Sequence, residues 1–135
     1  MSRIRIKNFG PIREGFIENN GWLDVEKVTV FIGNQGSGKS TVAKLISTLS
    51  WIEKDLFRSD GSTIRFRKQE RIFKKYLEYH RIDGYLKDNT EIQYEGEAYK
   101  ITYKPGSNLT YKNWTQITFF LKSLIFLPKG ILYLQ

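Results

Sequence analysis

The feature that most constrains this chain is a glycine-rich loop between a short apolar run and a helical pattern. The loop fits the pattern G-x-x-x-x-G-K-[ST], and its residues are Gly33, Asn34, Gln35, Gly36, Ser37, Gly38, Lys39, Ser40 and Thr41. Residues 28–32 before it are mostly β-branched, and apolar residues after it recur at spacings of three and four. A strand, this loop and a helix in that order predict a site for the phosphates of a nucleoside triphosphate.

Each part of the loop has a chemical role in such a site. Glycines let backbone N–H groups point at an anion, and the N-terminus of the next helix adds the positive end of its dipole. We expect Lys39 to reach the β- and γ-phosphates, Ser40 to bind Mg²⁺ through its hydroxyl and Thr41 to lie near the α-phosphate. The alternative is a turn from strand to helix with an incidental lysine. The loop itself thus predicts a nucleoside triphosphate with Mg²⁺ as the ligands.

The composition indicates a globular protein from a reducing compartment. A chain of 135 residues can bury a core, and 15% aromatic residues argue against disorder. Without cysteine it has neither a disulfide framework nor a thiolate metal site. We find no signal peptide and no apolar run of transmembrane length. We therefore expect a cytoplasmic protein without membrane contact.

The net charge is +8, and the basic excess lies mostly after residue 60. Such an excess attracts nucleic acid by releasing counterions from phosphates, and it also keeps a protein soluble. Both interpretations stay open.

Strand and turn signals fill the segment before the loop. Ile4 and Ile6 alternate with basic residues, which predicts a strand with one buried face. A Gly-Pro turn follows, and the Asn20-Gly21 pair predicts a hairpin between strands at 15–18 and 22–25.

Two helices are predicted after the loop. Apolar residues at helical spacing from Val42 to Leu56 indicate a helix packed on a sheet. The basic segment 64–87 indicates an amphipathic helix, whose charged face is either a solvated surface or a site for nucleic acid or a partner. His80, the single histidine, is interpreted as a packing or surface residue because a lone histidine makes a poor metal site.

The last third alternates like a sheet. Residues 91–95 and 98–103 predict a hairpin, and 109–112 a third strand. Its interleaved tyrosines and lysines either stack bases or fill a half-buried sheet. Beyond them we expect a short helix at 117–123, a buried strand at 124–127 and an apolar run at 131–134.

Two motifs together resemble a known family. The loop has the form G-x-x-G-x-G-K-[ST]-T typical of ABC-type ATPases and some kinases, and Ile4-x-Ile6-x-Asn8-Phe9-x-x-Ile12 resembles the opening of RecF-like and structural-maintenance-of-chromosomes ATPases and of bacterial "AAA family ATPase" proteins. The resemblance implies an α/β P-loop NTPase fold of ABC type. We expect a parallel core strand and helix, an N-terminal antiparallel layer and an α+β insertion. It also implies a second ATPase head that sandwiches ATP and, in many members, action on DNA or in bacterial defence.

Within one partial domain this divides the chain into a nucleotide-binding core (1–57), a basic helical insertion (58–89) and a hairpin with terminal apolar strands (90–135). Several parts typical of the family are missing from the sequence: an apolar run ending in Asp-Glu, a Ser-Gly-Gly signature and a switch histidine. Gln135 would occupy the position of the Mg²⁺-sensing glutamine. We therefore expect an incomplete fold, the N-terminal lobe of a larger ATPase that was cut or truncated, with no catalytic residue of its own. Such a lobe would bind ATP without hydrolysing it.

Two other hypotheses stay open. One is a small P-loop kinase for a metabolite or nucleotide, with lid arginines from 65–81, although the strands before the loop argue against it. The other is a nucleic-acid-binding or adaptor module in which the nucleotide is a structural ligand.

Overall fold

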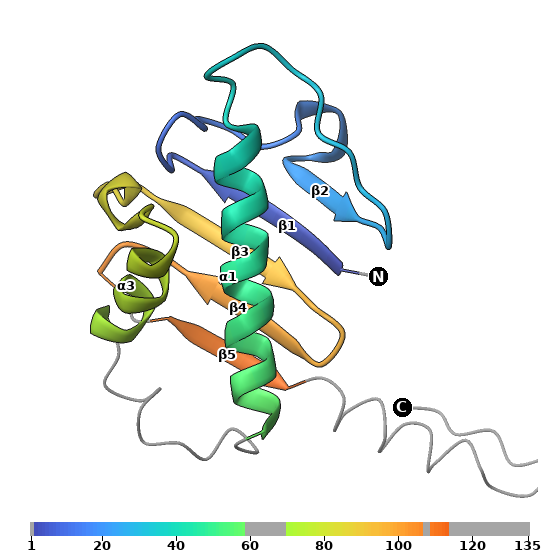
Figure 1. Ribbon diagram of the computed structural model, residues 1–135. Helices are drawn as coiled ribbons and strands as arrows, with labels where there is room; N and C mark the ends of the chain where they lie inside the picture. The colour runs from blue at the N-terminus through green and yellow to red at the C-terminus, as the bar shows by residue number, and fades with distance from the viewer. Residues whose placement is uncertain (1, 59–69, 107–108, 114–135) are drawn as a thin grey trace, which may run out of the picture.

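The structure of the chain, a computed structural model, describes residues 2–58, 70–106 and 109–113. In these residues five strands form one antiparallel sheet in the order β2-β1-β3-β4-β5. Helix α1 crosses one face of this sheet, and the shorter α3 lies beside it on the same face (Figure 1). The elements in chain order are β1 (Ser2–Lys7), the 3-10 turn η1 (Ile17–Asn19), β2 (Trp22–Val25), α1 (Lys39–Arg58), α3 (Glu70–Tyr79), the 3-10 turn η2 (Asp83–Tyr85), β3 (Glu91–Glu95), β4 (Tyr99–Tyr103) and β5 (Thr110–Asn113).

Strand β1 lies inside the sheet and joins two segments that are distant in sequence. Ile4 is opposite Leu23 of β2 on one side and opposite Tyr94 of β3 on the other. Ile4 and Ile6 are buried against the helical layer, as their alternation with basic residues predicts. The pairing of β1 with β3 is not indicated by any local pattern, and it makes one sheet of the N-terminal strands and the later hairpin.

Helix α1 supplies most of the helical side of the core. Leu45, Leu49, Ile52 and Leu56 are fully buried, and their spacing of three and four places them on one face of the helix. Burial of each such side chain stabilises the fold by about 1.5–3 kcal/mol. Helix α3 adds Phe73 and Leu77 to the same core. The predicted helices at 42–56 and within 64–87 are thus confirmed for α1 and α3.

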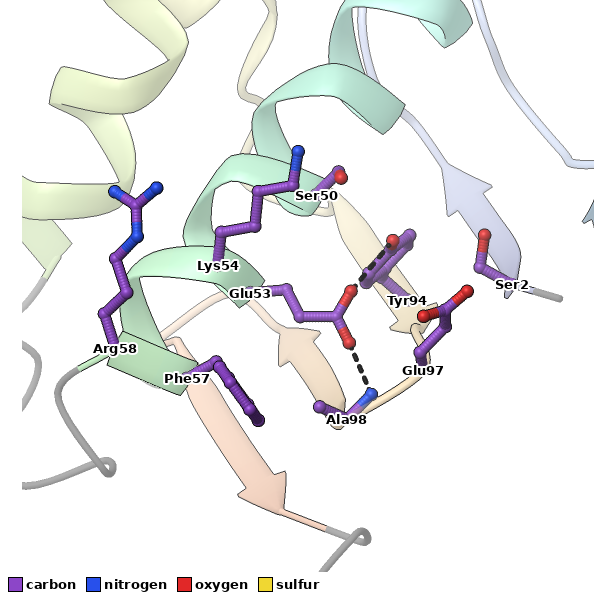
Figure 2. Close-up of a pocket in the computed structure, with 9 residues that line it drawn as sticks. All are labelled: Ser2, Ser50, Glu53, Lys54, Phe57, Arg58, Tyr94, Glu97 and Ala98. Atoms are coloured by element: carbon purple, nitrogen blue, oxygen red, sulfur yellow. Dashed lines mark hydrogen bonds between the residues drawn. The ribbon is translucent and has the colours of Figure 1, made fainter. Parts of the chain in front are cut away.

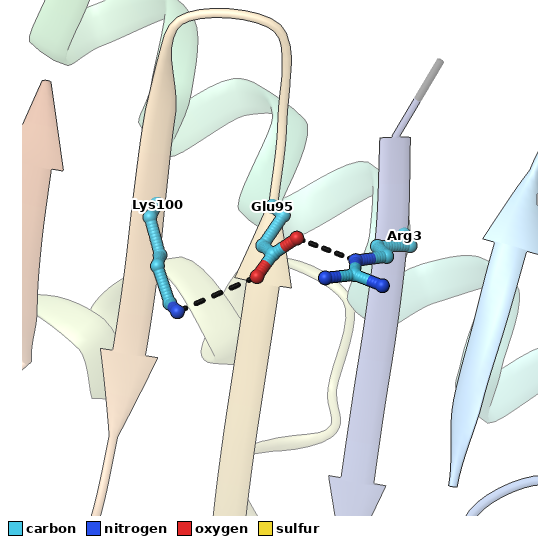
Figure 3. A network of polar contacts seen from close by, with 3 residues as sticks. All are labelled: Arg3, Glu95 and Lys100. Carbon is cyan, nitrogen blue, oxygen red and sulfur yellow. Dashed lines mark hydrogen bonds and ion pairs between the residues drawn. The ribbon is translucent and has the colours of Figure 1, made fainter. Parts of the chain in front are cut away.

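The opposite face of the sheet carries a charged network (Figure 3). The Arg3 guanidinium donates from Nε to Glu95 Oε2 at 2.5 Å, and Lys100 Nζ lies 3.4 Å from Glu95 Oε1. The hydrogen bond between Arg3 and Glu95 raises the pKa of Arg3 and lowers the pKa of Glu95. Arg3 also lies 4.4 Å above the Trp22 ring. Because Arg3 and Lys100 are almost half exposed, this network contributes only about 0–1 kcal/mol.

The hairpin predicted at 91–103 and the third strand near 109–112 are confirmed as β3, β4 and β5. The strand at 22–25 is confirmed as β2, but it pairs with β1, and the predicted hairpin between 15–18 and 22–25 is wrong. Asn20 and Gly21 have positive φ angles of 52° and 87°. The predicted strand at 15–18 is wrong, because that segment contributes only one isolated bridge, between Phe16 and Gly21, before η1 begins at Ile17.

The predicted core strand at 28–32 is not formed. The side chains of Val28, Val30 and Ile32 are 83%, 74% and 93% exposed. A strand needs a neighbour to share its backbone hydrogen bonds, and no backbone–backbone hydrogen bond between described residues involves this segment. The parallel core that we expect is therefore not part of the described sheet, which is antiparallel. The segments at 117–123, 124–127 and 131–134 lie outside the described residues.

Candidate functional site

The glycine-rich loop leads directly into α1. The helix begins at Lys39, and the Val42 N–H donates to the Gly38 carbonyl at 2.9 Å, which closes its first turn. Gly36 and Gly38 have φ angles of 78° and 93°, a region that residues with a Cβ rarely adopt. The two glycines thus permit the backbone path that turns the loop into the helix.

Several backbone N–H groups of the loop have no backbone acceptor among the described residues, and those of the exposed Gly36 and Ser40 are open to solvent. In the described part of the chain no backbone carbonyl accepts a hydrogen bond from the N–H of Gly36, Gly38 or Ser40, whereas Ser37 N–H donates to Asn34 O at 3.2 Å. These donors lie at the N-terminus of a 20-residue helix, where the dipole favours an anion. The loop therefore has the hydrogen-bonding chemistry of a phosphate site.

The Lys39 ammonium folds back across the loop. Its Nζ donates to the carbonyls of Gly33 and Asn34, both at 2.6 Å, and lies 3.4 Å from Ser37 Oγ. A bound phosphate would offer the ammonium a charged acceptor in place of two neutral carbonyls, and hydrogen bonds to charged acceptors are roughly twice as strong.

The two hydroxyl residues after Lys39 differ in exposure. Ser40 is exposed in the first turn of α1, in reach of a cation that phosphate oxygens also bind. Thr41 is buried, so its expected place near the α-phosphate is less open to a ligand. Among the described residues no group of three or more His, Asp or Glu side chains could hold a metal, and the expected Mg²⁺ ligand Ser40 has no such group beside it and offers one exposed hydroxyl.

A second segment lies against the loop. A hollow of about 630 Å³ is lined by Ser37 together with residues of the turn after β1. A Cβ placed on Gly38 would meet Ile12 at 3.0 Å and Pro11 at 3.4 Å, so the turn and the loop are in close contact. The residues that line the hollow are Asn8, Pro11, Ile12, Arg13, Glu14, Ile17 and Ser37. Sequence reasoning did not assign this turn to the site, although its Asn8-Phe9-x-x-Ile12 motif was the available signal.

The turn after β1 is held in place from the η2 side. Phe9 is fully buried and its ring meets Tyr85 edge to face at 5.9 Å. The Gly10 N–H donates to Tyr85 O at 3.1 Å, the Lys87 ammonium donates to Gly10 O at 3.0 Å, and the Thr90 hydroxyl donates to the carbonyl of Asn8. These bonds give the hollow beside the loop a fixed wall.

An apolar cavity of about 520 Å³ lies beneath the loop. Its walls come from the inner faces of β1 and β2, from residues 30–32 and from the start of α1, and Gly33, Ser37, Gly38 and Lys39 form part of its lining. The glycine-rich loop is thus bordered by one hollow of mixed polarity and one mostly apolar cavity.

Other predicted residues are placed as follows. Gln135 and residues 64–69, the first part of the basic segment, lie outside the described residues. His80 follows α3 and its ring lies 5.1 Å from the Tyr79 ring. No helix within the described ranges is long and apolar enough to span a bilayer.

Comparison with known proteins gives one family. The family described as ABC transporter matches residues 20–125, which is more than half of the chain and includes the whole glycine-rich loop. No curated protein and no solved structure matches the chain. From the extent of this match and the loop that it contains, the chain belongs to the ABC transporter family.

Proposed function

We propose that the chain is an ATP-binding lobe of an ABC-type ATPase of the RecF-like kind, which binds Mg·ATP through residues 33–41 and does not hydrolyse it alone. ABC-type domains bind ATP with Mg²⁺ and often dimerise, which supports both ligands and a second ATPase head as a partner. The observation that carries the proposal is the loop itself, with positive φ angles at Gly36 and Gly38 and, at the start of α1, N–H groups from which no backbone carbonyl of the described residues accepts a hydrogen bond.

The base of the nucleotide has a natural place beside the loop. The hollow lined by Ser37 and the turn after β1 adjoins the phosphate cradle and has both apolar and polar walls, from Ile12 and Asn8 respectively. A site of this kind suits a heterocycle with polar edges. We propose that the base lies there, and that the strand and turn before the loop favour a RecF-like lobe over a small kinase.

The groups that surround the cradle support the proposal that the isolated lobe does not hydrolyse ATP. Hydrolysis needs a group that orients the attacking water and charges that stabilise the transition state. Within the described residues the site offers Lys39, Ser40 and the nearby Glu14, and no group of three or more His, Asp or Glu side chains that could hold a metal. We infer that the isolated lobe binds nucleotide and that a partner or further part of the protein supplies the remaining groups.

Calorimetric titration with Mg·ATP tests the proposal. Lys39→Ala removes the ammonium and should weaken binding at least tenfold, because a hydrogen bond to a charged group contributes about 1.5–3 kcal/mol. Lys27→Ala, at an exposed lysine outside the loop, is the matched control and should bind like the unchanged chain. Equal affinity of both variants would refute the phosphate role of the loop, and steady phosphate release by the pure chain would refute the absence of hydrolysis.

A further inference from the structure

The solvent-facing side of α1 carries an unusual stripe. Its members recur at spacings of three and four and all are exposed, and they are Lys44, Ser47, Trp51, Lys54 and Arg58. The stripe lies on a different side of the helix from Leu45, Leu49, Ile52 and Leu56, which pack on the sheet. At 1.5 Å per residue it is roughly 21 Å long. It has three cations and no acidic residue.

A tryptophan in the middle of this stripe is partly open to solvent. Trp51 is 40% exposed, although its ring packs against α3. There the ring centroid lies 5.1 Å from that of Tyr76 and 5.2 Å from that of Tyr79, both edge to face. Tyr79 is itself 71% exposed, and Lys75 lies exposed one turn before it. The Tyr76 hydroxyl donates to Asp55 Oδ2 at 2.5 Å, which ties α3 to α1. Aromatic surface is thus held rigid and left in contact with water.

The stripe ends at a hollow of about 440 Å³ (Figure 2). Lys54, Arg58 and the 62% exposed Phe57 form one side of it. Figure 2 shows Glu53 pointing toward Tyr94 and Ala98, while Arg58 points away from them. The Glu53 carboxylate accepts hydrogen bonds from the hairpin backbone, and its charge is therefore directed away from the stripe.

We propose that this surface, defined by Lys44, Ser47, Trp51, Lys54, Arg58, Lys75 and Tyr79, binds single-stranded nucleic acid. Exposed aromatic rings stack with unpaired bases, and cations along the same line bind the phosphates between them. A duplex keeps its bases stacked on one another and cannot use the rings in this way. The net charge of +8 adds a general attraction for a polyanion. The surface includes no residue of the phosphate loop and goes beyond the proposed function.

Fluorescence anisotropy of the full chain with a labelled single strand tests the proposal. A strand of about twelve nucleotides is within the range of known single-strand sites. Trp51→Ala should weaken binding about tenfold and leave the salt dependence unchanged, because stacking involves no counterion. Trp51→Phe keeps an aromatic ring and should restore most of the affinity, which separates stacking from a change in folding. The double variant Lys54→Ala/Arg58→Ala should lower the slope of log K against log salt by about 1.4.

The matched control is Lys27→Ala/Lys112→Ala, which removes the same charge from exposed lysines elsewhere. Equal losses in the control and the stripe variant would show general attraction and overturn the proposal. The proposal would also be overturned by a lack of binding at low salt or by equal affinity for a duplex. It would be overturned as well if a glutamate-rich peptide competed equally well, because this would indicate an acidic protein as the occupant. Lys39→Ala should bind the single strand normally, so that failure of the nucleotide site and failure of this surface are distinguished.

Discussion

Replacing Glu53 tests how α1 is fastened to the sheet. Glu53 Oε1 accepts the N–H groups of Ala98 at 2.7 Å and Tyr99 at 3.0 Å, and Oε2 accepts the Tyr94 hydroxyl at 3.3 Å (Figure 2). Ala98, Tyr99 and Tyr94 are buried, so Glu53→Ala leaves their donors without this acceptor. Each hydrogen bond to a charged group contributes about 1.5–3 kcal/mol. Because water reaches the half-buried Glu53, the contribution of these bonds is reduced, and Glu53→Ala should lower the free energy of unfolding by about 2–3 kcal/mol. Thermal unfolding followed by circular dichroism should show a decrease of about 6–9 °C in Tm.

A matched control lies in the same hollow. Glu97 is exposed and makes no hydrogen bond with the described residues, so Glu97→Ala should change the free energy of unfolding by less than about 0.5 kcal/mol. Gly96 allows this arrangement, because a Cβ there would lie 2.2 Å from both Glu53 carboxylate oxygens. Gly96→Ala should therefore lower stability in the unchanged chain and much less in Glu53→Ala. Equal Tm values for Glu53→Ala and Glu97→Ala would refute the proposed role of Glu53 in fastening α1 to the sheet. Additive effects of Glu53→Ala and Gly96→Ala would refute it as well.

Two further substitutions, at Tyr94 and at Val30, give additional tests. Burial, with the nearby charge of Glu53, raises the pKa of Tyr94 to about 12. The folded pKa therefore lies above the unfolded value of about 10. The stability due to the neutral phenol is consequently lost as the pH rises from about 10 to 12. Tyr94→Phe should flatten that loss in urea unfolding at pH 8 and pH 11, and identical pH dependence in both proteins would contradict it. Val30→Lys should reduce self-association measured by light scattering without lowering Tm, because this 74% exposed side chain belongs to an uncharged extended segment that invites pairing. The control Leu23→Lys, at a partly buried position, should instead lower Tm. A lower Tm for Val30→Lys with an unchanged Tm for Leu23→Lys would show that Val30 is packed.

Local sequence patterns predicted most elements of this fold. Helix α1 follows from the spacing of Leu45, Leu49, Ile52 and Leu56, and the β3–β4 hairpin follows from its alternation. Period and turn chemistry are properties of neighbouring residues, so the sequence alone carries them. The pairing of β1 with β3 joins Ile6 to Ile92, and nothing in either local pattern selects that partner. Strand order depends on the whole core, which local patterns do not describe.

The same distinction applies to the site. Residues 33–41 could be predicted as a phosphate site from the sequence, because phosphate binding requires glycines and a lysine at set spacings. The turn after β1 was not assigned to the site, because its role depends on Ile12 meeting Gly38 in space. The strand predicted at 28–32 shows the opposite case. Its composition favours a strand, yet β propensity acts only where a neighbouring strand completes the backbone bonds.

The phosphate loop is therefore supported by two elements other than its preceding segment. One is α1, whose first turn closes at Gly38 and whose apolar face is anchored in the core. The other is the turn after β1, which is held by Tyr85 and by Thr90 immediately before β3. Both supports depend on the antiparallel sheet, since β1 and β3 pair side by side. Nucleotide affinity should consequently follow the integrity of the sheet and of α1, whereas substitutions on the exposed side of residues 28–32 should leave the geometry of the loop unchanged.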